Sequence, residues 1–132
     1  MKKSLFHLPE LGYQLTDLAP MMSQKTLSYH YGKHFQTYID NLNMLIEDTK
    51  YEGLPLDDLV RKAPDGPIAN NAGQVLNHQL FFEQFLPDKD AKMPSGDMLF
   101  LIEQSFSQFD TMRELMDKTA KSFFGSGWGW LA

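Results

Sequence analysis

The sequence predicts an all-α fold, with a long helical hairpin, two further helices and a short strand at the C-terminal end. Apolar residues recur at helical spacing along two long segments, which proline and glycine separate. Hydrophobic residues make up 42% and charged residues 22% of the chain, which is typical of a globular protein. At 132 residues the chain can bury a core without disulfides, and it contains no cysteine.

The first long helix is expected from Ser23 to about Asp48, after an irregular arm of residues 1–22. Ser23 is a suitable N-cap because its hydroxyl can accept a hydrogen bond from a free backbone N–H. Gly32 costs about 1 kcal/mol relative to alanine, so we expect a bend there. One face is mostly polar, and the opposite face, which we expect to be buried, carries Leu27, His30, Tyr31, His34, Phe35, Tyr38, Leu42 and Leu45.

The return half of the hairpin is predicted after a turn and a short helix at Leu56–Lys62. Pro67 suits the first turn of the second long helix, where its missing N–H is not needed. This helix is expected to run to about Leu86, because Pro87 cannot continue it. Its inner face carries Asn71, Gln74, His78, Phe81, Phe82 and Phe85.

A polar segment at 88–97, with proline and glycine, predicts a linker between a hairpin domain, 1–87, and the start of a second domain, 98–132. The second domain is expected to contain two helices, at Asp97–Phe106 and from a capping box at Ser107-Gln108-Phe109-Asp110 to about residue 124.

Trp128 and Trp130 are typical of the opening of a strand, and a strand needs a partner to pair its backbone groups. We therefore expect a chain truncated before its sheet.

The charge pattern excludes several functional classes. The formal net charge is −5, and the 12 basic residues form no run, so no nucleic-acid partner is expected. No apolar stretch reaches the roughly 20 residues that span a bilayer. The few apolar residues before Pro9 are too short a segment for the core of a signal peptide. These features predict a cytoplasmic protein with no membrane partner.

Two predicted helices carry the side chains that could bind a metal ion or take part in a reaction. His30, His34 and Tyr38 follow i, i+4, i+8 spacing on the first helix, and His78 lies on the second. In helical bundles, imidazoles on facing helices are common metal ligands. Hydrogen-bonded core histidines would give the same spacing. The spacing alone leaves both interpretations open.

Three runs of residues resemble the iron/manganese superoxide dismutase family. They are LSYHYGKHFQTY at 27–38, NNAGQVLNH at 70–78 and FGSGWGWL at 124–131. The resemblance covers the chain in order. It implies one iron or manganese ion per complete site, superoxide as substrate, a likeness to the iron-type members and assembly as a homodimer.

The resemblance also implies individual roles. His30 and His78 would be metal ligands, and His34 and Tyr38 would lie at the substrate entrance, with Tyr38 in proton delivery. Gln74 would hydrogen-bond the metal-bound solvent, and Trp128 would form a wall of the site.

The sequence departs from the family at its end. The family completes its site with an Asp-x-Trp-x-His segment, and only Leu131 and Ala132 follow Trp130. We therefore expect an amino-terminal portion that lacks two of four protein ligands. Phe35 stands where the family often has a second histidine, and we expect this change to affect the outer wall.

Two other functions fit the sequence. One is a non-catalytic, truncated helical module. The other is a zinc site with an open position, formed by the three histidines His30, His34 and His78.

Overall fold

The structure, a computed structural model, describes residues 6–132. The chain forms two compact units, which divide between Ala91 and Lys92, within the predicted linker at 88–97. All regular secondary structure of the described residues is helical, as predicted. No helix in this part of the chain is both long enough and apolar enough to span a membrane.

The first arm of the hairpin is built from three consecutive helical segments, α1 (Gln24–Tyr29), η1 (His30–Phe35) and α2 (Gln36–Ile46). Ser23 caps the arm as predicted, since its side-chain oxygen accepts the Thr26 backbone N–H at 3.1 Å. The middle segment, η1, is a π-helix and not the regular α-helix that the spacing predicted. Its backbone bonds reach one residue further than in an α-helix, so it winds more slowly.

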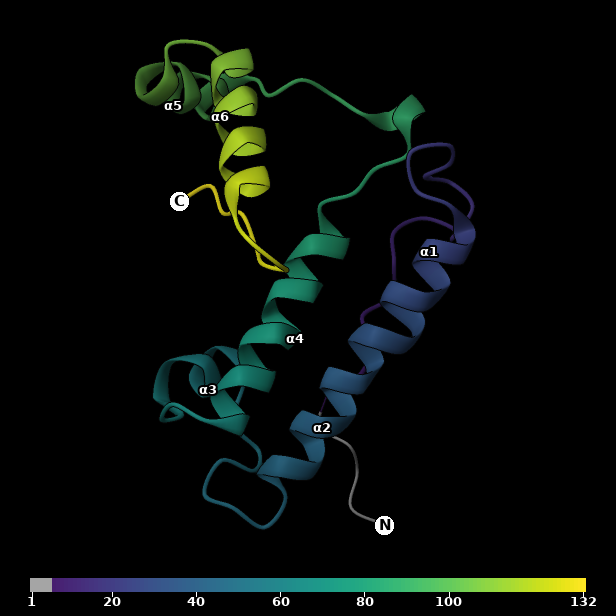
Figure 1. Cartoon of the computed structure of the whole chain (residues 1–132), viewed down its shortest axis with the longest axis vertical. Helices are drawn as coiled ribbons and strands as arrows, with labels where there is room; N and C mark the ends of the chain where they lie inside the picture. The colour runs from purple at the N-terminus through teal and green to yellow at the C-terminus, as the bar shows by residue number, and fades with distance from the viewer. Residues whose placement is uncertain (1–5) are drawn as a thin grey trace. The chain divides into compact units, whose positions relative to one another are not determined.

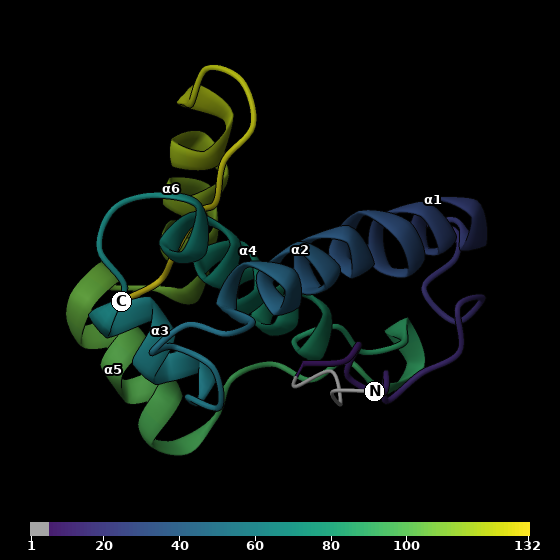
Figure 2. The ribbon, with the colours of Figure 1, turned by 90° about the horizontal axis from the view of Figure 1, so that it is seen from below.

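The second arm is α4 (Pro67–Glu83), which has Pro67 in its first turn as predicted and ends three residues before the expected Leu86. It runs back along the first arm (Figure 1) and contacts both η1 and α2. The short helix α3 (Leu56–Lys62) matches its predicted bounds and packs against α4. The view from below also places α2 beside α4 (Figure 2).

The core of the first unit lies between the two arms. Its side chains recur every three or four residues from Phe35 onward on the first arm and along α4. Fully burying a large apolar side chain contributes roughly 1.5–3 kcal/mol. The first arm supplies Leu27, Phe35, Ile39, Leu42 and Ile46, and α4 supplies Ala72, Val75, His78 and Phe82.

The N-terminal arm is fixed against the hairpin by hydrogen bonds. The Tyr13 hydroxyl donates to the Phe82 carbonyl at 3.0 Å. Asn43 pairs with the backbone of Phe6, accepting its N–H at 3.1 Å and donating to its carbonyl at 2.9 Å. The Tyr31 hydroxyl donates to the Pro9 carbonyl. These bonds join segments that lie far apart in the sequence.

A short 3-10 helix, η2 (Asp88–Asp90), follows the hairpin. The second unit contains α5 (Gly96–Phe106) and α6 (Phe109–Ser122), which pack against each other and bury Ile102 and Met112.

The predicted capping box is wrong. The N-cap of α6 is Gln108, which makes no side-chain cap bond, and Ser107 has a φ of 68°. Residue 107 instead ends α5, so its hydroxyl is not placed at the start of α6. Residues 127–132 form no regular secondary structure, so the predicted strand is not formed within the part of the chain that the structure describes.

Candidate metal centre

The imidazole of His78 lies at the centre of a cluster of rings inside the hairpin. The ring centroids of His30, His34, Phe35 and Tyr38 lie 5.1, 5.2, 5.3 and 5.3 Å from that of His78. His78 itself is 1% exposed. The fold thus brings together the rings of His30, His34, Tyr38 and His78, four of the six residues predicted for the site, and adds Phe35.

The π-helix explains how one arm places so many rings on a single histidine. Successive side chains of an α-helix point about 100° apart, so even neighbours on the same predicted face, such as His34 and Phe35, are widely separated around the axis. Slower winding in η1 brings successive side chains closer together around the helix axis. His34 and Phe35 therefore both reach His78, although they are adjacent in the sequence.

A hydrogen bond fixes the tautomer of His78. Its Nδ1 lies 2.8 Å from the carbonyl oxygen of Gln74, one helical turn earlier. A carbonyl only accepts, so Nδ1 carries the proton and donates it. In the neutral ring the lone pair then belongs to Nε2, which is buried. A backbone carbonyl on the far nitrogen is a common way to orient a metal-binding imidazole.

Both candidate ligands are held toward their neutral form. Burial lowers the pKa of His78 despite the opposing Gln74 carbonyl, and the nearby His30 and His34 lower it further. Burial also lowers the pKa of His30, and the neighbouring His34 adds to the effect. A neutral imidazole is the form that binds a metal ion, so the environment favours binding.

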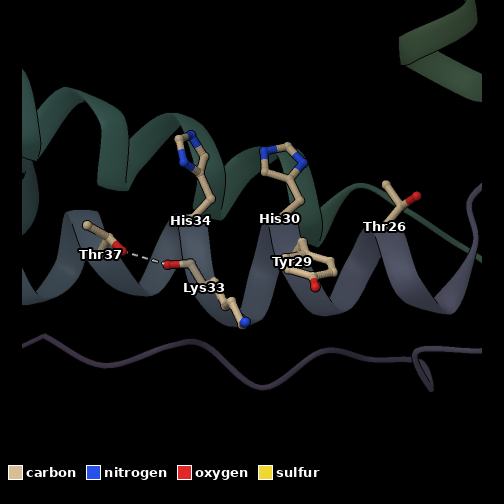
Figure 3. Close-up of a pocket in the computed structure, with 6 residues that line it drawn as sticks. All are labelled: Thr26, Tyr29, His30, Lys33, His34 and Thr37. Carbon is tan, nitrogen blue, oxygen red and sulfur yellow. Dashed lines mark hydrogen bonds between the residues drawn. The ribbon is translucent and has the colours of Figure 1, made fainter.

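The two histidines of η1 also border an open surface cavity of about 540 Å³, which is lined by Thr26, Tyr29, His30, Lys33, His34 and Thr37. Their imidazoles point to the same side of the helix (Figure 3). His30 is half-buried, but His34 is exposed, so the prediction that both lie on the buried side is wrong for His34. Its ring packs edge-on against Tyr38, with centroids 4.9 Å apart.

Phe35, which was expected to affect the outer wall of the site, packs directly on its central histidine. It is 1% exposed and stacks on His78 at an interplanar angle of 20°. Phe82, which the sequence placed on the inner face without a role in the site, lies 5.0 Å from the His30 ring and stacks on Phe35. Its position one turn after His78 was the available signal.

Two predicted roles remain predictions. Gln74 is half-buried, and its backbone carbonyl accepts the Nδ1 proton of His78. Trp128 belongs to the second unit.

The three histidines are not arranged as a zinc site in this structure. The centroids of the His30 and His34 rings lie 5.7 Å apart, and both are close to His78. Within residues 6–132, however, no three His, Cys, Asp or Glu side chains are arranged to hold a metal ion. The arrangement therefore offers a pair of imidazoles, and a complete site needs ligands beyond them.

The fold and the cluster define the class of protein: a helical hairpin with a candidate metal centre between its arms. Residues 5–86 match the family model described as iron/manganese superoxide dismutases, alpha-hairpin domain. Residues 94–132 match the model for the C-terminal domain of the same proteins. The chain belongs to the iron/manganese superoxide dismutase family.

Individual relatives agree with this assignment. "Superoxide dismutase [Fe]" of Bacteroides fragilis is 45% identical over 127 residues, which cover 96% of this chain and 66% of the relative. The protein of that name from Legionella pneumophila is 44% identical, with coverages of 96% and 65%. "Superoxide dismutase [Mn/Fe]" of Porphyromonas gingivalis is 44% identical, with coverages of 95% and 64%. The chain thus spans about two thirds of the length of these relatives.

Proposed function

We propose that this chain supplies two ligands, His30 and His78, to the iron or manganese ion of a superoxide dismutase. The observation that carries the proposal is the hydrogen bond from His78 Nδ1 to the Gln74 carbonyl at 2.8 Å. It makes the buried Nε2 the nitrogen with the lone pair, beside a second imidazole whose centroid is 5.1 Å away.

The donor set fits the ion. Imidazole nitrogen suits iron and manganese, and two histidines alone hold such an ion weakly. The proposal therefore requires further ligands, which the resemblance gives as an aspartate and a histidine. Relatives named for iron favour iron, and one relative is named for both metals.

One-electron exchange with superoxide is the chemistry that such an ion supplies when bound, and overall two superoxide anions and two protons give dioxygen and hydrogen peroxide. The residues of the chain bring protons and exclude water. His34 is open to solvent and contacts Tyr38, which is half-buried against His78, so the two form a short route for protons from the cavity. Phe35 and Phe82 cover the opposite side of the cluster. We assign the Gln74 side chain to orienting solvent at the site.

Metal binding by the full chain tests the proposal. Purified protein is titrated with Mn²⁺, or with Fe²⁺ under anaerobic conditions, and bound Fe, Mn and Zn are quantified by elemental analysis. His30→Gln and His78→Gln should each weaken binding by about tenfold or more. His7→Gln, at an exposed histidine outside the cluster, should leave binding unchanged.

His34→Gln separates the remaining interpretations. A small effect on metal binding would mean that His34 lies beside the site and is not a ligand. A loss equal to that of His78→Gln, together with stoichiometric zinc, would establish the three-histidine zinc site instead. If the purified chain retains none of the three metals, it is by itself a non-catalytic helical module. The proposal is wrong if the parent chain, His30→Gln and His78→Gln all bind Mn²⁺ equally.

We also infer a homodimer, which the resemblance implies. Light scattering after size exclusion should then give twice the chain mass of 15.2 kDa. A mass of one chain at micromolar concentration would contradict the inference.

A further inference from the structure

Two donors hold the peptide group between Lys33 and His34, inside the π-helix η1. The carbonyl oxygen of Lys33 accepts the backbone N–H of Gln36. It also accepts the hydroxyl of Thr37 at 2.8 Å, the bond drawn as a dashed line in Figure 3. A carbonyl inside a regular α-helix needs only the N–H four residues later. The extra side-chain bond thus spans the junction between η1 and α2, from the second residue of α2 to a carbonyl inside η1.

This peptide group controls the direction of His34. The Lys33 carbonyl and the His34 N–H belong to the same planar unit, so a bond that fixes one fixes the other. π-helical turns are rare, and the ordinary α-helical pattern competes with them at every residue. If η1 changed to α-helical winding, His34 and Phe35 would diverge around the axis, and both could no longer pack on His78 at 5.2 and 5.3 Å.

We propose that Thr37 is a positioning residue, whose hydroxyl holds the end of the π turn and thereby keeps His34 and Phe35 together on His78. The functional importance of this arrangement rests on the proposed role of His78 as a metal ligand. The arrangement of the rings does not depend on that role, and it can be measured in the metal-free chain.

The simpler explanation is that Thr37 only satisfies a carbonyl one turn earlier, as serine and threonine do in many helices. The chain offers a matched control for this explanation. Ser28 donates to the Gln24 carbonyl at 2.8 Å, also across four residues, but in α1 and before the π turn. Both bonds are exposed, so their removal should cost similar stability.

The experiment compares Thr37→Val, Thr37→Ser and Ser28→Ala in the full, metal-free chain. Solution NMR reads the ring signals of His34, Tyr38 and His78, which depend on mutual ring placement, and hydrogen exchange reads the backbone amides of residues 30–36. Thr37→Val should shift the ring signals and speed exchange in that segment by about fivefold. Thr37→Ser, which keeps the hydroxyl, should restore the parent spectrum. Ser28→Ala should leave the rings unchanged.

The proposal is overturned if Thr37→Val and Ser28→Ala leave the ring signals equally unperturbed, because Thr37 would then only satisfy a carbonyl. Thr37→Ala serves as a second variant, since alanine favours helix and keeps the chain folded while removing the same hydroxyl. Failure of the proposed function is a separate result. His30→Gln and His78→Gln would then bind Mn²⁺ as well as the parent does, whatever the ring signals of Thr37→Val show.

Discussion

The two units of the chain bury their apolar side chains to very different extents. In the hairpin unit, large side chains from both arms are completely enclosed, with Phe35 at 1% and Phe82 at 0% exposure. In the α5–α6 unit only Ile102 and Met112 are buried, whereas Phe100 remains 59% exposed. Helices were predicted in both units, from apolar periodicity in the hairpin and from a capping box in the second unit. A facing helix alone does not make a core, since α5 and α6 pack against each other and bury one large apolar side chain each.

The comparison also explains where the candidate centre lies. Ring placement within a few tenths of an ångström requires side chains whose rotamers are locked by packing. The hairpin provides such packing around His78, since Phe35 stacks on one face and Tyr38 lies nearby. Exposed aromatic side chains, such as Phe124 in the second unit, have no comparable restraint among the described residues.

The largest expected effect comes from removing a core ring of the hairpin. Phe82→Ala should lower the free energy of unfolding by about 3–5 kcal/mol, because it leaves a cavity beside His30 and His78. The matched change Phe100→Ala, in α5, should stay within about 0.5 kcal/mol. Urea unfolding gives the two values, and hydrogen exchange in α4 assigns the loss to the hairpin. Equal losses for the two variants would contradict the contrast between the units.

A smaller effect is expected where the N-terminal arm meets α4. Tyr13→Phe removes the donor to the buried Phe82 carbonyl and should cost about 1–2 kcal/mol. Tyr29→Phe, at a tyrosine that is 54% exposed, is the control and should be nearly neutral. Hydrogen exchange should rise in α4 and not in α6. A uniform rise through both helices would mean that the two units do not unfold separately.

The smallest effect is a dependence on pH that is confined to one unit. All 4 histidines lie in the hairpin unit, and burial lowers the pKa of both His30 and His78. The unfolded chain then binds protons first, so this part of the stability is complete above about pH 6.5 and is lost as the pH falls toward the lowered folded values. Hydrogen exchange of the metal-free chain between pH 7 and 5, corrected for intrinsic rates, measures the loss. Protection in α4 should decrease, and protection in α5 should not. Constant protection in α4 would contradict the expected sign.

Much of the fold could be predicted because local chemistry determined it. Ser23 was identified as an N-cap, and Pro67 as a first-turn residue, from their own properties, and the structure confirms both. The prediction of a capping box at Ser107 was wrong. The same four residues fit a helix start at Ser107 or one residue later, so their sequence does not fix where the chain bends. The bend at φ 68° depends on how α5 meets α6, which periodicity does not record.

The site was only partly predictable for a similar reason. His30, His34, Tyr38 and His78 were found because imidazole and phenol spacing is visible in the sequence, and the structure brings them together. The pattern read at about 100° per residue placed Phe35 on the buried face, but its close contact with His78 was missed, because that pattern assumes α winding throughout. Gly32, identified as a weak point of the helix, lies in the middle of η1 and was the only local sign of the irregularity.

The bonds of the N-terminal arm have a consequence for the order in which the chain assembles. Tyr13 and its acceptor on Phe82 are 69 residues apart, and Phe6 and Asn43 are 37 apart. Closing such long loops costs chain entropy before the contacts repay it. The acceptor carbonyl of Phe82 is positioned only once α4 has formed against the first arm. We therefore expect the N-terminal arm to dock last during refolding. A fluorescent reporter near Tyr13 would then report when the hairpin is complete.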